Sequence, residues 1–269
     1  MEISVIMGVY NPARPEHLIQ AVQSIVRQSF PHWEMLLYDD GSGPNYAGAI
    51  QAAAKLDSRI RYLRGEENRG LAHALNQCIA HARGKYLARM DADDIAWPER
   101  FARQHQFLET HPQYQWVGST ARLMDESGIW GLETVAEIPE ARDFLSHSPY
   151  IHPTVLFRRG ALGEGYREAG RFRLCEDYEL FMRLHQQGGL GYNLQTPLLD
   201  YRQDAGAYKK RTLGRRLRET GLRYQGFRAL GILRPGTFPY VLKPLAVAAI
   251  PGPIQHVIAQ RRKGKPWIG

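Results

Sequence analysis

The chain has 269 residues, which fits one large domain or one domain with an appendage and is long enough to bury a sizeable core. Hydrophobic residues make up 43% of it, and 35 Lys and Arg against 27 Asp and Glu give a formal net charge of +8. Its two cysteines, Cys78 and Cys175, are too few for a disulfide framework and lack the spacing of a metal site, so a reducing compartment is expected.

The first half of the chain alternates apolar β-type runs with segments of helical periodicity. The predicted strands are Ile3–Val9, Trp33–Tyr38, Ile60–Leu63 and Lys85–Met90, and the predicted helices between them are Arg14–Ser29, Ala47–Leu56 and Gly70–Ala82. This rhythm is typical of βαβ units and predicts an α/β fold with a mainly parallel sheet. Ligands of such sheets bind at the carboxyl edge, where polar side chains follow the strands.

The second half is less regular. We predict a strand Trp116–Met124 that turns at 126–128 into a hairpin, a strand Thr154–Phe157, a helix Glu176–Gln187, and helices Thr212–Leu230 and Val241–Arg262. A change in composition near residue 205 divides the chain into a domain of residues 1–205 and a helical, basic extension of residues 206–269. Within the domain, residues 1–95 form the regular half and residues 96–205 the less regular half.

The charge is unevenly distributed. From Tyr201 onward the chain has 15 Lys and Arg and two acidic residues, whereas the preceding residues have 20 and 25. A basic tail on an acidic body indicates an anionic partner, such as a membrane surface, a lipid phosphate or nucleic acid, unless it is only a solvated helical face. The most apolar stretch, Phe238–Ile258, is interrupted by Lys243 and several prolines, which argues against a membrane-spanning helix. At the other end of the chain, the pattern of Met1–Tyr10 is typical of a strand and not of a signal peptide.

Three carboxylates, Asp91, Asp93 and Asp94, follow the fourth predicted strand. Like charges this close repel one another unless a cation or hydrogen-bond donors offset them. Carboxylate oxygens suit Mg²⁺ or Mn²⁺, which would neutralise a diphosphate leaving group. The structural alternative is a polar turn that caps a helix.

Polar residues also follow the second and third predicted strands. Asp39 and Asp40 are placed to accept hydrogen bonds from a base or ribose, or else to form an Asx-type turn. Asn68 and Arg69 precede a helix, whose N-terminal N–H groups favour phosphate, although Asn68 is also an ordinary N-cap residue.

Glu176 and Asp177 open a predicted helix in the second half. A carboxylate near the sheet edge can remove a proton from an acceptor hydroxyl, while acids in a first helical turn also complement the helix dipole. His152 and Arg202 stay ambiguous between a site and a structural role.

The chain resembles family 2 of the GT-A-fold glycosyltransferases in six segments that occur in the family's order: MEISVIMGVYNP, LLYDDGS, NRGLAHALN, ARMDADD, HPTVLFRR and EDYELFMRL. The resemblance covers roughly residues 1–205 and implies that residues 1–95 form a nucleotide-binding half and residues 96–205 an acceptor half. It implies a Rossmann-like, mainly parallel sheet flanked by helices, and a metal-dependent, inverting transfer of a hexosyl-type sugar from a nucleotide-diphospho-sugar, with UDP as the leading nucleotide.

The resemblance assigns roles to individual residues. The nucleotide-sugar is expected at Val9, Tyr10, Asp39, Asp40, Asn68, Arg69, Asp91 and Ala92, and Mn²⁺ or Mg²⁺ at Asp93 and Asp91, with Asp93 the direct ligand. Asp177 matches the family's general base, with Glu176 beside it. Arg69 and Arg89 are further candidates for contact with the donor phosphates.

One segment departs from the family's processive members. Their Q-x-x-R-W motif is absent, and Tyr201–Asp204 stands in its place, which favours addition of one sugar per acceptor. The resemblance further implies a saccharide or polyprenyl-diphosphate-linked saccharide as acceptor, in polysaccharide biosynthesis, with no nucleic-acid partner.

The same resemblance suggests a cytoplasmic enzyme that is peripheral on the inner membrane. The residues expected at the bilayer are Leu242, Leu245, Ala246, Val247 and Ile250, followed by Arg261, Arg262, Lys263 and Lys265. The alternative for this segment is a helical cap on the main domain.

Two other functions remain in view. A nucleotidyltransferase shares the nucleotide-binding sheet but usually has a Gly-rich, basic loop after its first strand, which Val9–Pro12 does not provide. A membrane-associated scaffold that has lost activity is the non-catalytic alternative, and the presence of Asp91, Asp93 and Asp177 argues against it.

Overall fold

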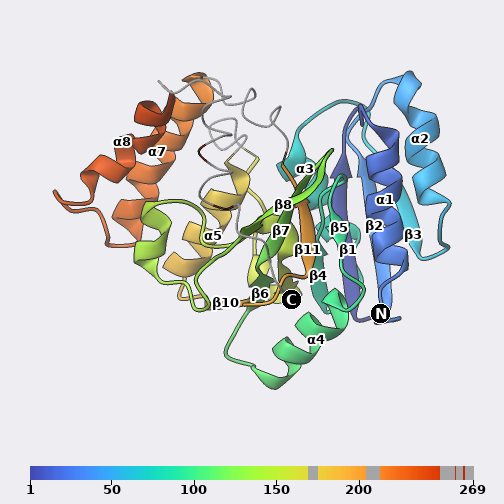
Figure 1. Ribbon diagram of the computed structural model, residues 1–269, viewed down its shortest axis with the longest axis horizontal. Coiled ribbons are helices and arrows are strands. Elements are labelled where there is room, and N and C mark those ends of the chain that lie inside the picture. The colour runs from blue at the N-terminus through green and yellow to red at the C-terminus, as the bar shows by residue number, and fades with distance from the viewer. Residues whose placement is uncertain (169–174, 204–212, 249–257, 259–262, 264–269) are drawn as a thin grey trace.

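The computed structural model describes residues 1–168, 175–203, 213–248, 258 and 263 (Figure 1). A seven-stranded mixed sheet with the strand order β10-β6-β9-β4-β1-β2-β3 forms its centre. The strands of this sheet are β1 (Ile3–Val9), β2 (Trp33–Asp39), β3 (Ile60–Arg64), β4 (Tyr86–Arg89), β6 (Trp116–Ser119), β9 (Leu156–Arg158) and β10 (Gly191–Leu194).

The first four strands are parallel neighbours, as the alternating pattern predicts. They are joined by α1 (Pro15–Val26), α2 (Pro44–Ala54) and α3 (Leu71–His81), and the register pairs Val9 with Asp39. Because parallel strands end at one edge, the residues that follow β1, β2 and β4 meet there.

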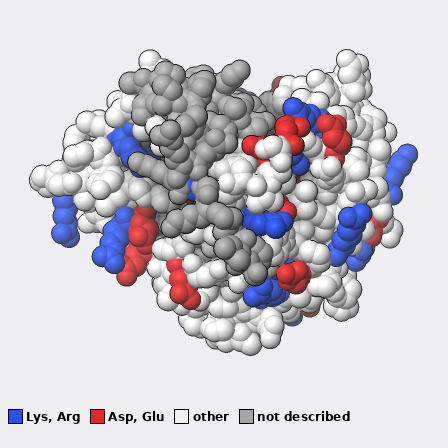
Figure 2. Space-filling view, viewed as in Figure 1, with Lys and Arg blue, Asp and Glu red and all other residues white. Residues whose placement is uncertain are grey.

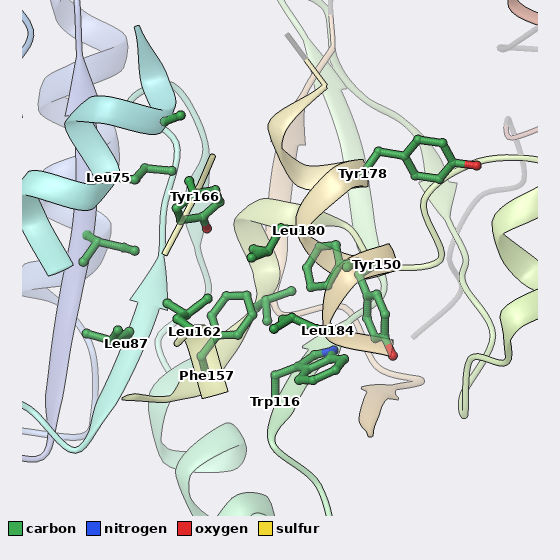
Figure 3. Close-up of a cluster of buried hydrophobic side chains, with 14 of the residues drawn as sticks. Leu75, Leu87, Trp116, Tyr150, Phe157, Leu162, Tyr166, Tyr178, Leu180 and Leu184 are labelled. Atoms are coloured by element: carbon green, nitrogen blue, oxygen red, sulfur yellow. The ribbon is translucent and has the colours of Figure 1, made fainter. Parts of the chain in front are cut away.

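The sheet is covered on both faces. Along β1, Ile3, Val5 and Met7 pack in one cluster with the apolar faces of α1, α2 and α4 (Arg100–Thr110), whereas Ile6 belongs to the other cluster. That second cluster contains α3 and α5 (Glu176–Gln186), and Figure 3 shows its centre, where Trp116 and Phe157 lie beside Leu180 and Leu184. Alternation of side chains along each strand therefore builds a three-layer α/β/α fold.

Helix α4 was not predicted, because its buried positions include the polar residues Arg100 and Gln104 as well as Phe101 and Leu108. Both polar side chains are satisfied inside the fold. Arg100 Nη2 donates to the Arg89 carbonyl at 2.8 Å, and Gln104 Nε2 donates to the carbonyls of Val117 and Thr154 at 3.0 and 2.7 Å. Polar residues at core positions weaken the hydrophobic period on which a helix prediction depends.

The predicted strand Trp116–Met124 is wrong as a single element, because the chain changes sheets at Thr120. Strand β6 pairs with β9 and β10 in the main sheet, whereas β7 (Ala121–Asp125) pairs with β8 (Gly128–Glu133) in a hairpin of the second sheet. The Thr120 N–H donates to the Leu194 carbonyl at 3.0 Å, which marks the corner. The hairpin itself is confirmed.

The second sheet has the order β5-β11-β7-β8 and adds β5 (Ile95–Ala96) and β11 (Leu199–Arg202). Short 3₁₀ helices η1 (Ala141–Leu145) and η2 (His152–Thr154) lie between β8 of this sheet and β9 of the main sheet, and η3 (Arg159–Leu162) follows β9. Strand β9, predicted from Thr154–Phe157, lies antiparallel between β4 and β6, so the sheet is parallel-rich and not uniformly parallel.

Helices α7 (Leu213–Ala229) and α8 (Phe238–Ala248) make up most of the described part of the C-terminal segment and lie on the side of the molecule opposite α1 and α2 (Figure 1). Leu222, Phe227 and Val241 are buried in the same cluster as α5. Arg223 Nη1 donates to the Leu145 carbonyl at 2.8 Å. These contacts attach the helices firmly to the domain.

Helix α8 begins earlier than predicted and contains Pro244. No helix in the described parts of the chain is long and apolar enough to cross a membrane. The predicted boundary near residue 205 and the residues Ile250, Arg261, Arg262 and Lys265 lie outside the described residues.

Gly41, in the turn after β2, tests how tightly this edge is built. Its φ is +72°, and an added Cβ would lie 2.5 Å from the Glu67 carbonyl carbon. Gly41→Ala should therefore lower the free energy of unfolding by about 1–3 kcal/mol in urea denaturation. The control Gly48→Ala, in α2 with nothing within 4 Å of its added Cβ, should leave stability unchanged or raise it by up to about 1 kcal/mol. Equal effects at the two positions would contradict the described turn.

Candidate active site

A cavity of about 1110 Å³ opens at the carboxyl edge of the parallel strands. It draws its walls from both halves of the chain and from the C-terminal helices. Of the predicted site residues it is lined by Val9, Tyr10, Asp40, Asn68, Asp91, Glu176 and Asp177, and Arg89, His152 and Tyr201 line it as well. Residues separated by more than 160 positions in the sequence therefore share one cavity.

Asp39 lies at the end of β2 and is fully buried. Its Oδ1 accepts a hydrogen bond from the Ser42 N–H at 2.8 Å, and its Oδ2 accepts one from the Tyr62 hydroxyl at 2.9 Å. Arg64 pairs with the same carboxylate at 3.3 Å. Asp39 is thus buried and is not among the residues that line the cavity, whereas Tyr10, directly after β1, is half exposed and lines it.

Asp40 organises the loop before α3. Its Oδ2 accepts hydrogen bonds from Asn68 Nδ2 at 2.9 Å and from the Gly70 N–H at 2.7 Å, and its Oδ1 accepts one from the Arg69 N–H at 3.1 Å. Gly70, at φ +96°, is the N-cap of α3, so Asn68 does not cap this helix. The Arg69 side chain is 54% exposed, pairs with Glu168 at 3.5 Å and is not among the residues that line the cavity.

The acidic loop after β4 brings three carboxylates together. One oxygen each of Asp91, Asp93 and Asp94 lies within 4.8 Å of the others. Asp91 faces the cavity, Asp93 is exposed, and Asp94 is fully buried. Ala92, which separates the first two, packs against the hydrophobic core and does not line the cavity.

Arg202 on β11 fixes this loop from the second sheet. The backbone N–H of Arg202 donates to Asp94 Oδ1 at 2.8 Å, and its side-chain Nε donates to the backbone carbonyl of Asp93 at 2.9 Å. The sequence left Arg202 ambiguous, and the structure gives it a positioning role. No sequence signal links it to Asp94, which is more than a hundred residues away and reaches it only through the β5–β11 pairing.

The crowding of the carboxylates shows in their proton affinities. Burial of the carboxyl group raises the pKa of Asp93 to about 6, and the neighbouring charge of Asp91 adds to the effect. Burial also raises the pKa of Asp94 well above its usual range, followed by the charges of Asp91 and Asp93.

These three residues fit a divalent cation. They offer only oxygen ligands, which Mg²⁺ and Mn²⁺ prefer. Asp94 Oδ2 is buried and has no hydrogen-bond partner within the described part of the chain. Asp94 was not among the predicted ligands, although its position next to Asp93 in the sequence could have suggested it.

Arg89, at the end of β4, neutralises part of this charge. Its guanidinium is 3% exposed and pairs with Asp91 at 2.6 Å through Nη1, and it lines the cavity. Burial works to lower the pKa of Arg89, but the charge and hydrogen bond of Asp91 outweigh it and raise that pKa. A fixed cation therefore stands beside the acidic loop.

Asp177 and Glu176 face the cavity from the first turn of α5. Burial raises the pKa of Asp177, while hydrogen bonds from the backbone and the charges of Arg215 and Arg89 oppose the rise. Glu176 and Asp177 therefore complement the dipole of α5 and also line the cavity, so the two interpretations from the sequence do not exclude each other.

His152 lies on η2 at the cavity wall. Its Nε2 and the Tyr166 hydroxyl are hydrogen-bonded at 2.7 Å. Burial and then the charge of Arg89 hold the pKa of His152 well below its usual range, so the imidazole is neutral at physiological pH. His152 thereby holds Tyr166, which is buried and is not among the residues that line the cavity.

The mixed α/β sheet, with acidic residues at its carboxyl edge and a cavity beside them, has the architecture of the GT-A class. The family described as Glycosyl transferase family 2 matches residues 4–165, more than half of the chain, and the protein belongs to that family.

Curated relatives agree with this membership. The chain is 36% identical over 264 residues to the putative glycosyltransferase EpsE of Bacillus subtilis, covering 97% of this chain and 94% of that protein. It is 31% identical to the amylovoran biosynthesis glycosyltransferase AmsE of Erwinia amylovora, covering 77% and 79% of the two chains.

Solved structures agree in fold. Residues 1–349 of TarS from S. aureus superpose with a TM-score of 0.66 at 16% identity, covering 93% of this chain and 74% of that one. The mannosyltransferase PcManGT of Pyrobaculum calidifontis, in complex with GDP-Man and Mn²⁺, gives a TM-score of 0.60 at 18% identity, covering 97% and 79%.

Asp40→Asn tests whether Asp40 organises the loop at residues 68–70. An amide in place of the carboxylate turns one acceptor oxygen into a donor that faces other donors, so we expect a loss of about 1–3 kcal/mol in the free energy of unfolding. Asp125→Asn, in an exposed turn where Asp125 Oδ1 accepts from the Ser127 N–H, is the control and should change little. Denaturation in urea compares the two, and a stable Asp40→Asn variant would contradict the assigned role.

Proposed function

We propose that the protein is an inverting glycosyltransferase that moves one sugar from a nucleotide-diphospho-sugar, with UDP as the leading nucleotide, to a hydroxyl of an acceptor. The observation that carries this proposal is the shared cavity, because Asp91 at one wall and Asp177 at another face the same space. Two TarS structures in complex with UDP and with UDP-GlcNAc support a UDP donor by analogy of fold.

The donor half of the site consists of the strand ends. Val9 and Tyr10 are proposed to contact the base, and Asp39 with Asp40 to support the ribose corner together with Asn68. Arg69, Asp91 and Ala92 complete the proposed nucleotide-sugar set. The buried hydrogen bonds of Asp39 and Asp40 support a preorganised corner, because fixed polar groups need no reorganisation when a ligand binds.

Asp93 and Asp91 are the proposed ligands of Mn²⁺ or Mg²⁺, which when bound supplies positive charge opposite the diphosphate. Arg89 adds a fixed positive charge in the cavity wall, and Arg202 holds the loop at Asp93 and Asp94. The oxygen-only donor set and the unpartnered Asp94 oxygen support this assignment.

Asp177 is the proposed general base. It removes the proton of the acceptor hydroxyl as the hydroxyl oxygen attacks the anomeric carbon, while the bond to the nucleotide diphosphate breaks on the opposite face. Attack from the opposite face inverts the configuration. Glu176 stands beside Asp177 and is proposed to position it.

The acceptor is proposed to be a saccharide, free or linked to a polyprenyl diphosphate, in polysaccharide biosynthesis. The names of the relatives support this class, since they include amylovoran biosynthesis and teichuronic acid biosynthesis glycosyltransferases. Residues 1–205 would hold the nucleotide-binding and acceptor halves, and residues 206–269 the basic extension.

The extension is proposed to hold the protein at the cytoplasmic face of the inner membrane. Exposed apolar side chains occur at helical spacing at Leu213, Leu217 and Tyr224 on α7, and at Phe238 and Leu242 on α8. At the left of Figure 2, the side of the molecule where these helices lie, Lys and Arg groups are visible, some of them beside Asp and Glu groups. Apolar and basic groups together favour an anionic bilayer surface.

Asp177→Asn tests the proposed chemistry. The amide keeps the shape and removes the base, so transfer should fall by about 10²–10⁴-fold while UDP affinity in Mn²⁺ stays unchanged. Because the pKa of Asp177 is raised, the wild-type rate should decline on acidification at a higher pH than an ordinary aspartate would give, and the variant should lack this limb. Near-normal turnover would assign the base elsewhere, and an inactive wild type would favour the scaffold alternative.

Leu217→Gln with Leu242→Gln tests the membrane contact. Both residues are exposed, so the fold should persist while binding to vesicles of anionic phospholipid weakens by about tenfold. The matched control changes Ile129 and Ile138, which are equally exposed but lie outside the extension, to Gln. If control and test variants sediment with vesicles to the same extent, the helices are a cap and not a membrane contact.

A further inference from the structure

Tyr201 of β11 lines the active-site cavity together with Asp91 and Asp177, yet the proposed mechanism gives it no role. Its ring packs against the hydrophobic cluster that also holds the apolar faces of α1, α2 and α4. Within the described part of the chain its hydroxyl makes no hydrogen bond, and its oxygen is not among the buried polar atoms that lack a partner. The hydroxyl is therefore open to the cavity, where a ligand can accept a hydrogen bond from it.

The residues on either side of Tyr201 hold its backbone in place. Asp200 accepts two hydrogen bonds from the Arg122 guanidinium, at 2.7 and 2.9 Å. On the other side, the backbone N–H of Arg202 donates to Asp94 Oδ1 at 2.8 Å. Tyr201 is thus tied through its neighbour to the acidic loop, and its side chain is a donor fixed beside that loop before any ligand binds.

Charges from both ends of the proposed reaction act on the Tyr201 hydroxyl. Burial raises its pKa, the charges of Asp94 and Asp91 add to the rise, and Asp177 contributes less, while Arg89 opposes it. The phenol therefore keeps its proton at physiological pH and acts as a hydrogen-bond donor. The larger influence of the acidic loop indicates that the hydroxyl lies toward the donor end of the cavity.

We propose that the Tyr201 hydroxyl donates a hydrogen bond to the leaving diphosphate, at the oxygen that is bonded to the anomeric carbon. The inference rests on the proposed function, because it takes the acidic loop as the donor end and Asp177 as the base. When the bond between the anomeric carbon and this oxygen breaks, the electron pair stays on the diphosphate, and a fixed donor stabilises the charge that grows there. Tyr201 keeps its own proton, since the proton of the acceptor hydroxyl passes to Asp177.

The surroundings of Tyr201 favour a phosphate oxygen as the acceptor of this bond. The nearby carboxylates do not take that part, because no hydrogen bond joins Tyr201 to them in the described structure and Asp91 already pairs with Arg89 at 2.6 Å. A charged phosphate oxygen is also a stronger acceptor than a sugar hydroxyl. An uncharged donor can therefore serve the diphosphate without neutralising the acidic loop.

The test measures binding of UDP and of UMP, both in Mn²⁺, to the full-length wild type and to Tyr201→Phe by calorimetry. UMP lacks the terminal phosphate that carries the leaving oxygen, so it reports on the rest of the site. The matched control is Tyr114→Phe, because the Tyr114 ring packs against the same hydrophobic cluster but does not line the cavity. Both substitutions keep the ring, and the unfolding temperature of each protein checks that the fold is retained.

Tyr201→Phe should bind UDP about tenfold more weakly than wild type and UMP within about twofold, because one hydrogen bond to a charged oxygen is lost. Tyr114→Phe should match the wild type with both nucleotides. An equal loss of UDP and UMP affinity in Tyr201→Phe, or no loss of either while wild type binds UDP, overturns the contact with the diphosphate alone. Failure of wild type to bind UDP in Mn²⁺ overturns the proposed function instead.

Discussion

Repulsion among three carboxylates at the end of β4 is the constraint on which this site depends. Asp91, Asp93 and Asp94 are held within 4.8 Å of one another, and part of their charge is buried. Two arginines make this arrangement tolerable. Arg89 pairs with Asp91 from within the sheet, and Arg202 reaches across from the second sheet to Asp94 and to the backbone of Asp93. The negative charge that these arginines do not neutralise belongs to a cluster of carboxylate oxygens, which suits a divalent cation.

The second sheet and the C-terminal helices gain a function from this arrangement. Strand β11 belongs to the second sheet. Its Arg202 donates hydrogen bonds to the acidic loop, and its Tyr201 lines the cavity. Helices α7 and α8 pack into the same hydrophobic cluster as α5 and also contribute Arg215 and Lys243 to the lining. The donor edge, the proposed base and the basic extension are therefore parts of one cavity.

The parallel half of the fold could be predicted because its signals are local. Apolar runs such as Ile3–Val9 and the helical spacing of Leu18, Val22 and Ile25 report burial directly, and the structure buries these residues. That the acidic residues after these strands meet at one edge follows from the parallel topology alone. By contrast, α4 was missed because Arg100 and Gln104 occupy core positions, and the break at Thr120 was missed because both of its sides are apolar and strand-like.

The sequence predicted which residues form the site better than it predicted how they are arranged. The cavity is lined by Val9, Tyr10, Asp40, Asn68, Asp91, Glu176 and Asp177, whereas Asp39 is buried in its own hydrogen bonds and Arg69 pairs with Glu168. The role of Arg202 depends on its hydrogen bond to Asp94, which lies more than a hundred residues away in the sequence. No local pattern encodes such contacts, since they exist only once the sheets have formed.

The most direct test of this account is a thermal-shift titration with UDP-, GDP- and dTDP-sugars, with and without Mn²⁺, on wild type and on Asp93→Ala. The account predicts that one nucleotide class, UDP before the others, stabilises the wild type only when Mn²⁺ is present. It also predicts that Asp93→Ala loses this metal-dependent shift while its unliganded unfolding temperature is kept or raised, because one repelling carboxylate is gone. A Mn²⁺-dependent shift of the same size in Asp93→Ala, or no shift of the wild type with any donor, would contradict the assignment of the acidic loop as the donor–metal site.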